Sequence, residues 1–137
     1  MKKIAILFPC IVLAVCLASC GGKVDSDIWE TAVYTQDTEL GQGEKTLYAE
    51  VTAEEKSVLF TVKTDEATVG EALFECGLIS GEQGPYGLYI KTVNGIYADY
   101  DKTKSYWAIT KNGEYLTTGA DTTEFADGDK FELTYTR

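Results

Sequence analysis

Apolar and polar residues alternate along much of the chain after residue 44, with the period of two that is typical of β-strands. The alternation is clearest in five segments, at 47–51, 58–63, 88–91, 106–111 and 131–136. Two Asn-Gly pairs, at 94–95 and 112–113, each separate a strand-like segment from a short apolar run. Asn-Gly favours the two-residue turn of a β-hairpin, because both residues readily adopt a positive φ. The pattern therefore predicts a mainly antiparallel sheet that contains several hairpins.

One segment has a helical period instead. Its apolar residues are spaced i, i+3, i+4 and i+7, which places on one helix face Val69, Ala72, Leu73 and Cys76. Thr68 and Glu71 fit a capping box at the start of this helix, and Gly77 is suited to its end. A helix between an early hairpin and a later sheet predicts an α+β fold. The simplest arrangement with this order is β-grasp-like, with one short helix packed on the sheet and Cys76 as a small core residue.

The first twenty residues have the features of a bacterial lipoprotein signal. Two lysines precede an apolar run at 4–18, which is too short at about 1.5 Å per residue to cross a hydrocarbon core of roughly 30 Å. The run ends in Leu-Ala-Ser-Cys at 17–20, which resembles the lipobox that precedes lipidation of its Cys. We therefore expect a lipoprotein signal peptide at 1–19 and lipidation of Cys20. The anchor places the protein on the extracellular face of the cytoplasmic membrane, in the bacterial cell envelope.

The remaining chain divides into two parts by pattern. Residues 20–44 are mostly polar and acidic, and they are interpreted as the lipidated Cys followed by a tether. The regular pattern predicts one domain at 45–137, which is long enough to bury a core without disulfides. A small apolar cluster interrupts the acidic part, and the alternative interpretation is that residues 29–34 add an edge strand to the domain.

Charge and composition narrow the classes of function. The chain has 22 acidic and 12 basic residues, a formal net charge of −10, which argues against binding to nucleic acid or to an anionic membrane through a basic patch. It contains no His, which removes the most common general base and metal ligand. Of four Cys, two lie in the expected signal peptide, Cys20 is expected to carry lipid, and only Cys76 remains, so no intramolecular disulfide is expected. We expect a binding protein and not an enzyme.

Five segments together resemble a known family. They lie at 68–73 (Thr-Val-Gly-Glu-Ala-Leu), 92–96, 106–115 (from Tyr-Trp to Asn-Gly-Glu-Tyr), 118–121 and 127–135. In this order they are similar to the transcobalamin C-terminal-domain-like family, which comprises small β-grasp-like domains of bacterial surface lipoproteins. The resemblance covers about 45–135 and implies this fold. It also implies cobalamin or another corrinoid as a bound ligand, with no intrinsic cofactor. The helical barrel that completes the cobalamin site of transcobalamins has no counterpart in this sequence.

Aromatic residues supply the candidate binding surface. Tyr combines a broad apolar ring with a hydroxyl, so exposed Tyr suits a flat amphipathic ligand or a protein partner. The candidate ligand-binding residues are Tyr86, Tyr89, Tyr97, Tyr100, Tyr106, Trp107, Asn112 and Tyr115. All of them also have a structural interpretation. Tyr favours half-buried positions in strands, Trp107 fits the core aromatic of a central strand, and Asn112 fits a hairpin turn.

The sequence thus predicts a non-catalytic binding module that is anchored to the membrane by lipid and binds a corrinoid ligand or an envelope protein. The alternative is a protein- or glycan-binding surface or adhesion module with no small-molecule ligand. Asp99 and Asp101 have the spacing that begins a calcium loop, but the expected Gly and the distal Glu do not follow, so no metal site is predicted.

Overall fold

The computed structural model describes residues 27–85 and 87–137. The expected signal peptide, the expected lipidation site at Cys20 and the candidate ligand-binding residue Tyr86 therefore lie outside the described residues. None of the helices within the described ranges is both long and apolar enough to cross a membrane.

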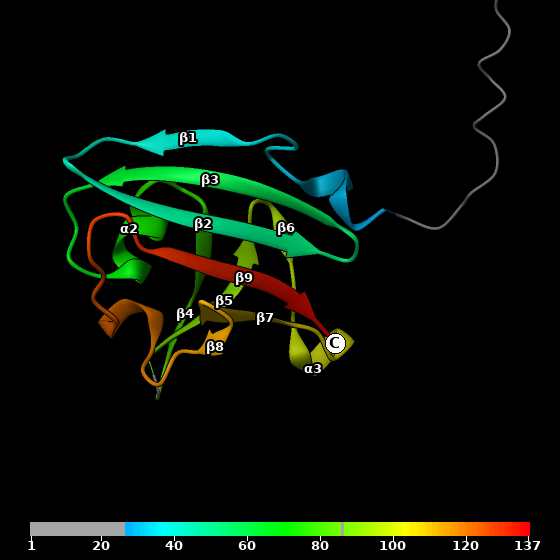
Figure 1. Cartoon of the computed structure of the whole chain (residues 1–137). Helices are drawn as coiled ribbons and strands as arrows, with labels where there is room; N and C mark the ends of the chain where they lie inside the picture. Colours follow the sequence, from blue (N-terminus) through cyan, green and yellow to red (C-terminus); the bar gives the residue numbers. More distant parts are fainter. Residues whose placement is uncertain (1–26, 86) are drawn as a thin grey trace, which may run out of the picture.

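Two sheets and one helix of two turns form most of the described structure (Figure 1). The larger sheet has six strands, in the order β1 (Thr38–Gly41), β3 (Lys56–Thr64), β2 (Lys45–Ala53), β9 (Lys130–Thr136), β7 (Tyr106–Lys111) and β8 (Glu114–Tyr115). The smaller sheet has three, in the order β4 (Ile79–Gly84), β5 (Gly87–Val93) and β6 (Ile96–Tyr97). Short helical segments are α2 (Val69–Glu75), α3 (Tyr100–Thr103), η2 (Ile28–Thr31) and η3 (Ala120–Thr122). The predicted α+β fold, with a helix packed on a mainly antiparallel sheet, is confirmed.

The core lies between the larger sheet and the elements that cover one of its faces. Strand β2 forms an antiparallel hairpin with β3 and pairs in parallel with β9, so both of its edges are bonded. Figure 1 shows α2 and the smaller sheet on the same side of the larger sheet. Alternate residues of β2, β3 and β9 point to that side, and the fully buried ones include Leu47, Val51, Phe60, Phe131 and Leu133. The apolar residues of the alternating pattern therefore face the core, and the polar residues between them face the opposite side of the sheet.

Helix α2 begins and ends where its local sequence predicts. The Thr68 hydroxyl accepts a hydrogen bond from the Glu71 amide at 3.3 Å, and Gly77 follows the helix with a φ of 84°. A Cβ on Gly70 would lie 2.7 Å from the Asp121 amide nitrogen, so only glycine permits this close approach of α2 to η3. Cys76 is half-buried and packs beside the core at the end of the helix, while the other three residues of the predicted stripe are fully buried.

The segment expected to be a tether is instead packed against the domain over residues 27–44. Trp29 is only 7% exposed and its Nε1 donates to the Ala53 carbonyl oxygen at 3.0 Å. Strand β1 pairs in parallel with β3 and buries Leu40. The side chain of Asn94 is fully buried and bonds both backbone groups of Tyr34 at 2.9 Å. The edge strand thus exists, but at 38–41, and residues 29–34 begin with a 3-10 turn.

Two further elements are absent from the sequence prediction. Residues 79–84, which are rich in Gly and polar residues, form the edge strand β4, which pairs with β5. The single turn α3 begins after Asp99, whose carboxylate accepts a hydrogen bond from the Asp101 amide at 3.0 Å. Neither element buries an apolar stripe, so neither has a periodic pattern. The two Asn-Gly turns are present, and all four of their residues have a positive φ.

Replacing Trp29 tests whether the N-terminal segment is part of the cooperative domain. We expect Trp29→Ala to lower the free energy of unfolding by about 3–5 kcal/mol, because it removes a large buried ring and leaves a cavity. Denaturant unfolding followed by far-UV circular dichroism measures the change. Val33→Ala is the control, since Val33 is exposed in the same segment, and it should change stability by less than about 0.5 kcal/mol. Equal stability of Trp29→Ala and the parent chain would contradict the packing described.

Candidate functional site

A hollow of about 260 Å³ opens where β5 of the smaller sheet faces β7 of the larger one. No ladder joins β5 to β7 in the part of the chain described, so the hollow lies between two strands that are not paired with each other. Four of the candidate residues line it, namely Tyr89, Tyr106, Trp107 and Tyr115. Leu88, Ile90, Ile109 and Leu116 add apolar surface, and residues 118–120 close one side. Aromatic residues from three separate strands thus converge on one site.

Trp107 forms the inner wall of the hollow and also belongs to the core. It is 6% exposed, and its Nε1 donates to the Ile96 carbonyl oxygen at 3.0 Å. The ring meets that of Tyr135 edge to face, with 5.6 Å between centroids. A Trp that is held on both its polar and its apolar side keeps one orientation. Trp107 is therefore both a core residue, as the structural interpretation predicts, and part of the lining of the hollow.

The tyrosines form the rim. Tyr115 is 68% exposed on β8 and Tyr89 is 39% exposed on β5. Tyr106 is half-buried and packs edge to face with Tyr100, with 6.4 Å between ring centroids. Tyr100 does not line the hollow, but this contact extends the aromatic surface beyond it. The rim is accessible to a ligand, whereas the inner wall is already packed.

Besides Tyr100, two more candidates lie outside this hollow. Tyr97 is exposed on β6 and does not line the hollow, and its hydroxyl donates to Asp99. Asn112 occupies the turn between β7 and β8 and lines an adjacent hollow of about 520 Å³, which shares Tyr115 and Leu116 with the first. Asn112 therefore borders the candidate site, and its positive φ of 54° shows that it also has the turn role considered from the sequence.

Asp121 supports the site, although it was not among the candidate residues. Its Oδ1 accepts a hydrogen bond from the Leu88 amide at 3.2 Å and its Oδ2 accepts one from the Gln83 side chain at 3.3 Å. These contacts attach the start of β5 to η3, and the Thr-Gly-Ala-Asp turn at 118–121 was one of the segments that carried the family resemblance. Leu88 and Leu116 could not be assigned from sequence, because an apolar residue in a groove has the same pattern as one in the core.

Asp99 and Lys91 are two charged residues near the site that contact its neighbouring tyrosines. The Tyr97 hydroxyl donates to Asp99 Oδ2 at 2.8 Å, and this bond holds the pKa of Asp99 below its ordinary value while it raises the pKa of Tyr97. Lys91 lies 3.4 Å from a Glu82 carboxylate oxygen and 5.6 Å from the centroid of the Tyr89 ring. Within the described ranges there is no group of three or more Cys, Asp or Glu residues that could hold a metal ion.

The family assignment rests on the second half of the chain. Residues 66–137, more than half of the chain, match the family described as a domain of unknown function (DUF4430). The chain belongs to the DUF4430 family. The match spans every strand that lines the hollow. No curated protein sequence matches this chain.

Solved structures extend the comparison. A protein from Ruminococcus gnavus ATCC 29149, described provisionally as metal-binding, is 41% identical, with a TM-score of 0.64 over 69% of this DUF4430 chain and 98% of its own. Haptocorrin in complex with Cbi is 18% identical, with a TM-score of 0.56 over 68% of this chain and 25% of its own. At that identity the likeness to haptocorrin shows the fold alone. The fold implied by the resemblance to the transcobalamin family is therefore shared with haptocorrin.

The contact between Tyr97 and Asp99 predicts a shifted titration. In the parent chain the Asp99 carboxyl should titrate below its ordinary pKa, and Tyr97→Phe should move that pKa back up because the hydroxyl donor is lost. Carboxyl carbon chemical shifts measured by NMR against pH follow the change. Since the folded pKa lies below the unfolded one, the stabilising contribution is complete above the ordinary pKa and disappears as the pH falls through the lowered value. An Asp99 midpoint that Tyr97→Phe leaves unchanged would contradict the assignment.

Proposed function

We propose that this DUF4430 chain is a non-catalytic binding module of the bacterial cell surface, anchored by lipid at Cys20, whose aromatic hollow binds part of a corrinoid such as cobalamin. The observation that supports this most directly is the convergence of Tyr89, Tyr106, Trp107 and Tyr115 on one accessible hollow. Aromatic rings favour broad ligands with apolar faces, and tyrosine hydroxyls can bond polar groups at the ligand edge.

The size of the hollow limits how the ligand is bound. At about 260 Å³ it is smaller than the 300–1,000 Å³ that usually encloses a small ligand. A corrin ring would insert one edge between β5 and β8, where Tyr89 and Tyr115 form the rim, and leave the rest accessible to solvent or to a second protein. The proposed role is therefore capture or presentation of a ligand at the surface.

Other members of the fold supply indirect support. The 41% identical protein is described provisionally as metal-binding, and haptocorrin is described in complex with Cbi, which is cobinamide. A corrinoid contains cobalt within an organic ring, so it combines the two descriptions in one ligand class. The proposal requires no protein imidazole, because packing and hydrogen bonds supply the contacts.

A titration tests the ligand. The chain beginning at residue 20, with Cys20→Ser to remove the lipid, is titrated with cobinamide and with cobalamin by calorimetry and absorbance. We expect saturable binding at sub-millimolar ligand. Tyr89→Ala and Tyr115→Ala should each raise the dissociation constant at least about fivefold, because each removes a ring at the proposed contact. Phe74→Ala, which truncates an exposed aromatic on α2, is the control and should bind as the parent does.

Two results would contradict this ligand assignment. Absence of heat and of a spectral change with both corrinoids would exclude them as ligands. Equal weakening by Phe74→Ala would show that loss of any surface aromatic affects binding, so that the hollow is not the site. Capture of one envelope protein, with the same yield whether or not a corrinoid is present, would favour the protein- or glycan-binding alternative.

Metabolic labelling tests the anchor. When the full chain is expressed in a bacterium with a labelled fatty acid, the label should appear on the parent and disappear in Cys20→Ser, because the thiol at that position is the proposed acceptor. Cys76→Ser is the matched control and should keep the label, since Cys76 is half-buried at the end of α2. Label retained by Cys20→Ser would exclude lipidation at this residue.

A further inference from the structure

The β-hairpin of β7 and β8 is held on one side, because β7 pairs with β9 whereas β8 is the end strand of the described sheet and pairs with β7. Its two strands are paired between Thr110 and Tyr115 and between Lys111 and Glu114. Beyond these pairs the Leu116 amide reaches the Ile109 carbonyl oxygen at 3.4 Å, which is long for a hydrogen bond. Both residues of β8 are exposed. Such a short strand needs an additional contact to keep one position.

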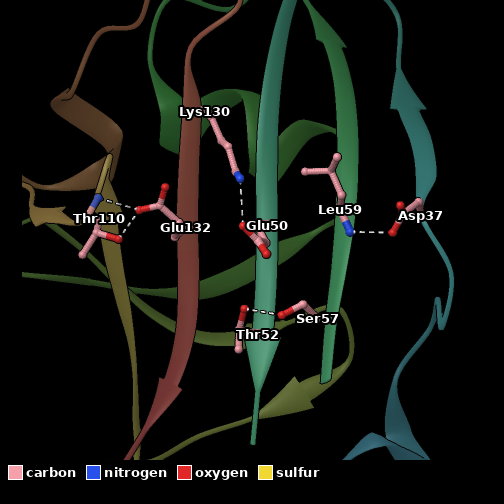
Figure 2. A network of polar contacts seen from close by, with 9 residues as sticks. Asp37, Glu50, Thr52, Ser57, Leu59, Thr110, Lys130 and Glu132 are labelled. Atoms are coloured by element: carbon pink, nitrogen blue, oxygen red, sulfur yellow. Dashed lines mark hydrogen bonds and ion pairs between the residues drawn. The ribbon is translucent and has the colours of Figure 1, made fainter. Parts of the chain in front are cut away.

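Glu132 supplies that contact from the neighbouring strand β9. Its Oε1 accepts a hydrogen bond from the Thr110 hydroxyl at 2.6 Å and a second from the Gly113 amide at 3.0 Å. Gly113 is the second residue of the turn that joins β7 to β8, so the carboxylate bonds the strand and the turn at once. Figure 2 shows Glu132 extending from β9 across to Thr110 on the sheet face that α2 does not cover.

A second glutamate beside it provides a natural comparison. Glu50 lies opposite Glu132 in the ladder between β2 and β9, and both side chains are on the same face in Figure 2. The Glu50 carboxylate is 2.9 Å from Lys130 Nζ, whereas the bonds of Glu132 go to the hairpin. Two residues of the same type, one strand apart, therefore hold different partners.

We infer that Glu132 is a positioning residue of the binding site, which fixes the β7–β8 hairpin and thereby holds Tyr115 at the rim of the hollow. Its carboxylate does not line the hollow and acts through the turn. Bonds to a charged acceptor are stronger than neutral ones, and here they connect an exposed turn to a strand at the centre of the sheet. The effect on ligand binding rests on the proposed function, whereas the effect on the hairpin does not.

The hairpin is examined first, without ligand. In Glu132→Ala the solvent-exchange rate of the Gly113 amide, measured by NMR, should rise about tenfold, because its charged acceptor is lost. Cross-strand nuclear Overhauser contacts between Thr110 and Tyr115 should weaken in the same variant. Glu132→Gln keeps an oxygen acceptor at the same place and should restore both signals largely to those of the parent. Glu50→Ala is the matched control and should leave Gly113 unchanged.

Binding is examined next, with cobinamide as the probe. We expect Glu132→Ala to raise the dissociation constant about threefold or more, with Glu132→Gln and Glu50→Ala close to the parent. An unchanged Gly113 exchange rate in Glu132→Ala, or an equal rise in Glu50→Ala, would overturn the positioning role. Failure of the parent chain to bind cobinamide would contradict the proposed ligand only, since the exchange rates and the contacts of Tyr115 decide the role of Glu132 independently.

Discussion

The parallel pairing of β2 with β9 is the contact on which the rest of the structure depends. It joins strands from opposite ends of the described chain, with Ala49 opposite Phe131 and Val51 opposite Leu133, all four of them buried. Strand β2 brings β3 and β1 to one side, and β9 brings β7 and β8 to the other. Because parallel strands need a long connection, the chain between them must cross one face of the sheet. That connection contains α2 and the smaller sheet, and together they cover the core.

The candidate site is a consequence of this crossing. The smaller sheet lies along the covered face until β5 approaches β7, but no ladder joins these two strands in the described chain. Where the two sheets meet without hydrogen bonds between their strands, side chains fill the space incompletely. Several of the side chains that border this hollow are aromatic. The hollow is therefore buried on the side of Trp107 and accessible to solvent on the side of Tyr115.

The polar face of the larger sheet carries bonds between side chains and neighbouring strands. Glu132 bonds the hairpin turn, Lys130 neutralises Glu50, and Asp37 accepts the Leu59 amide at the far edge (Figure 2). Isolated pairs of this type on a surface contribute little stability. The bonds of Glu132 and Asp37 instead act on geometry, because one holds the turn after β7 and the other holds the segment that leads into the edge strand β1. The DUF4430 fold therefore combines an apolar layer that provides stability with a polar layer that fixes its edges.

The sequence by itself determined the features that depend on neighbouring residues. The two Asn-Gly turns, the Thr68 cap and the alternation along β2 and β9 are local, and the structure has all of them. The lipoprotein signal is equally local, but it stays a prediction because its residues lie outside those described.

Only the tertiary structure decided the features that depend on distant partners. Trp29 lies in the core and donates to the Ala53 carbonyl oxygen, and the apolar cluster around it in the sequence does not indicate that partner. The sequence did not distinguish one candidate Tyr from another. In the structure Tyr89 and Tyr115 line the hollow, whereas the Tyr97 hydroxyl donates to Asp99. The period of the sequence predicts on which face of a strand a residue lies, but the packing of the two sheets against each other decides which residues that face contacts.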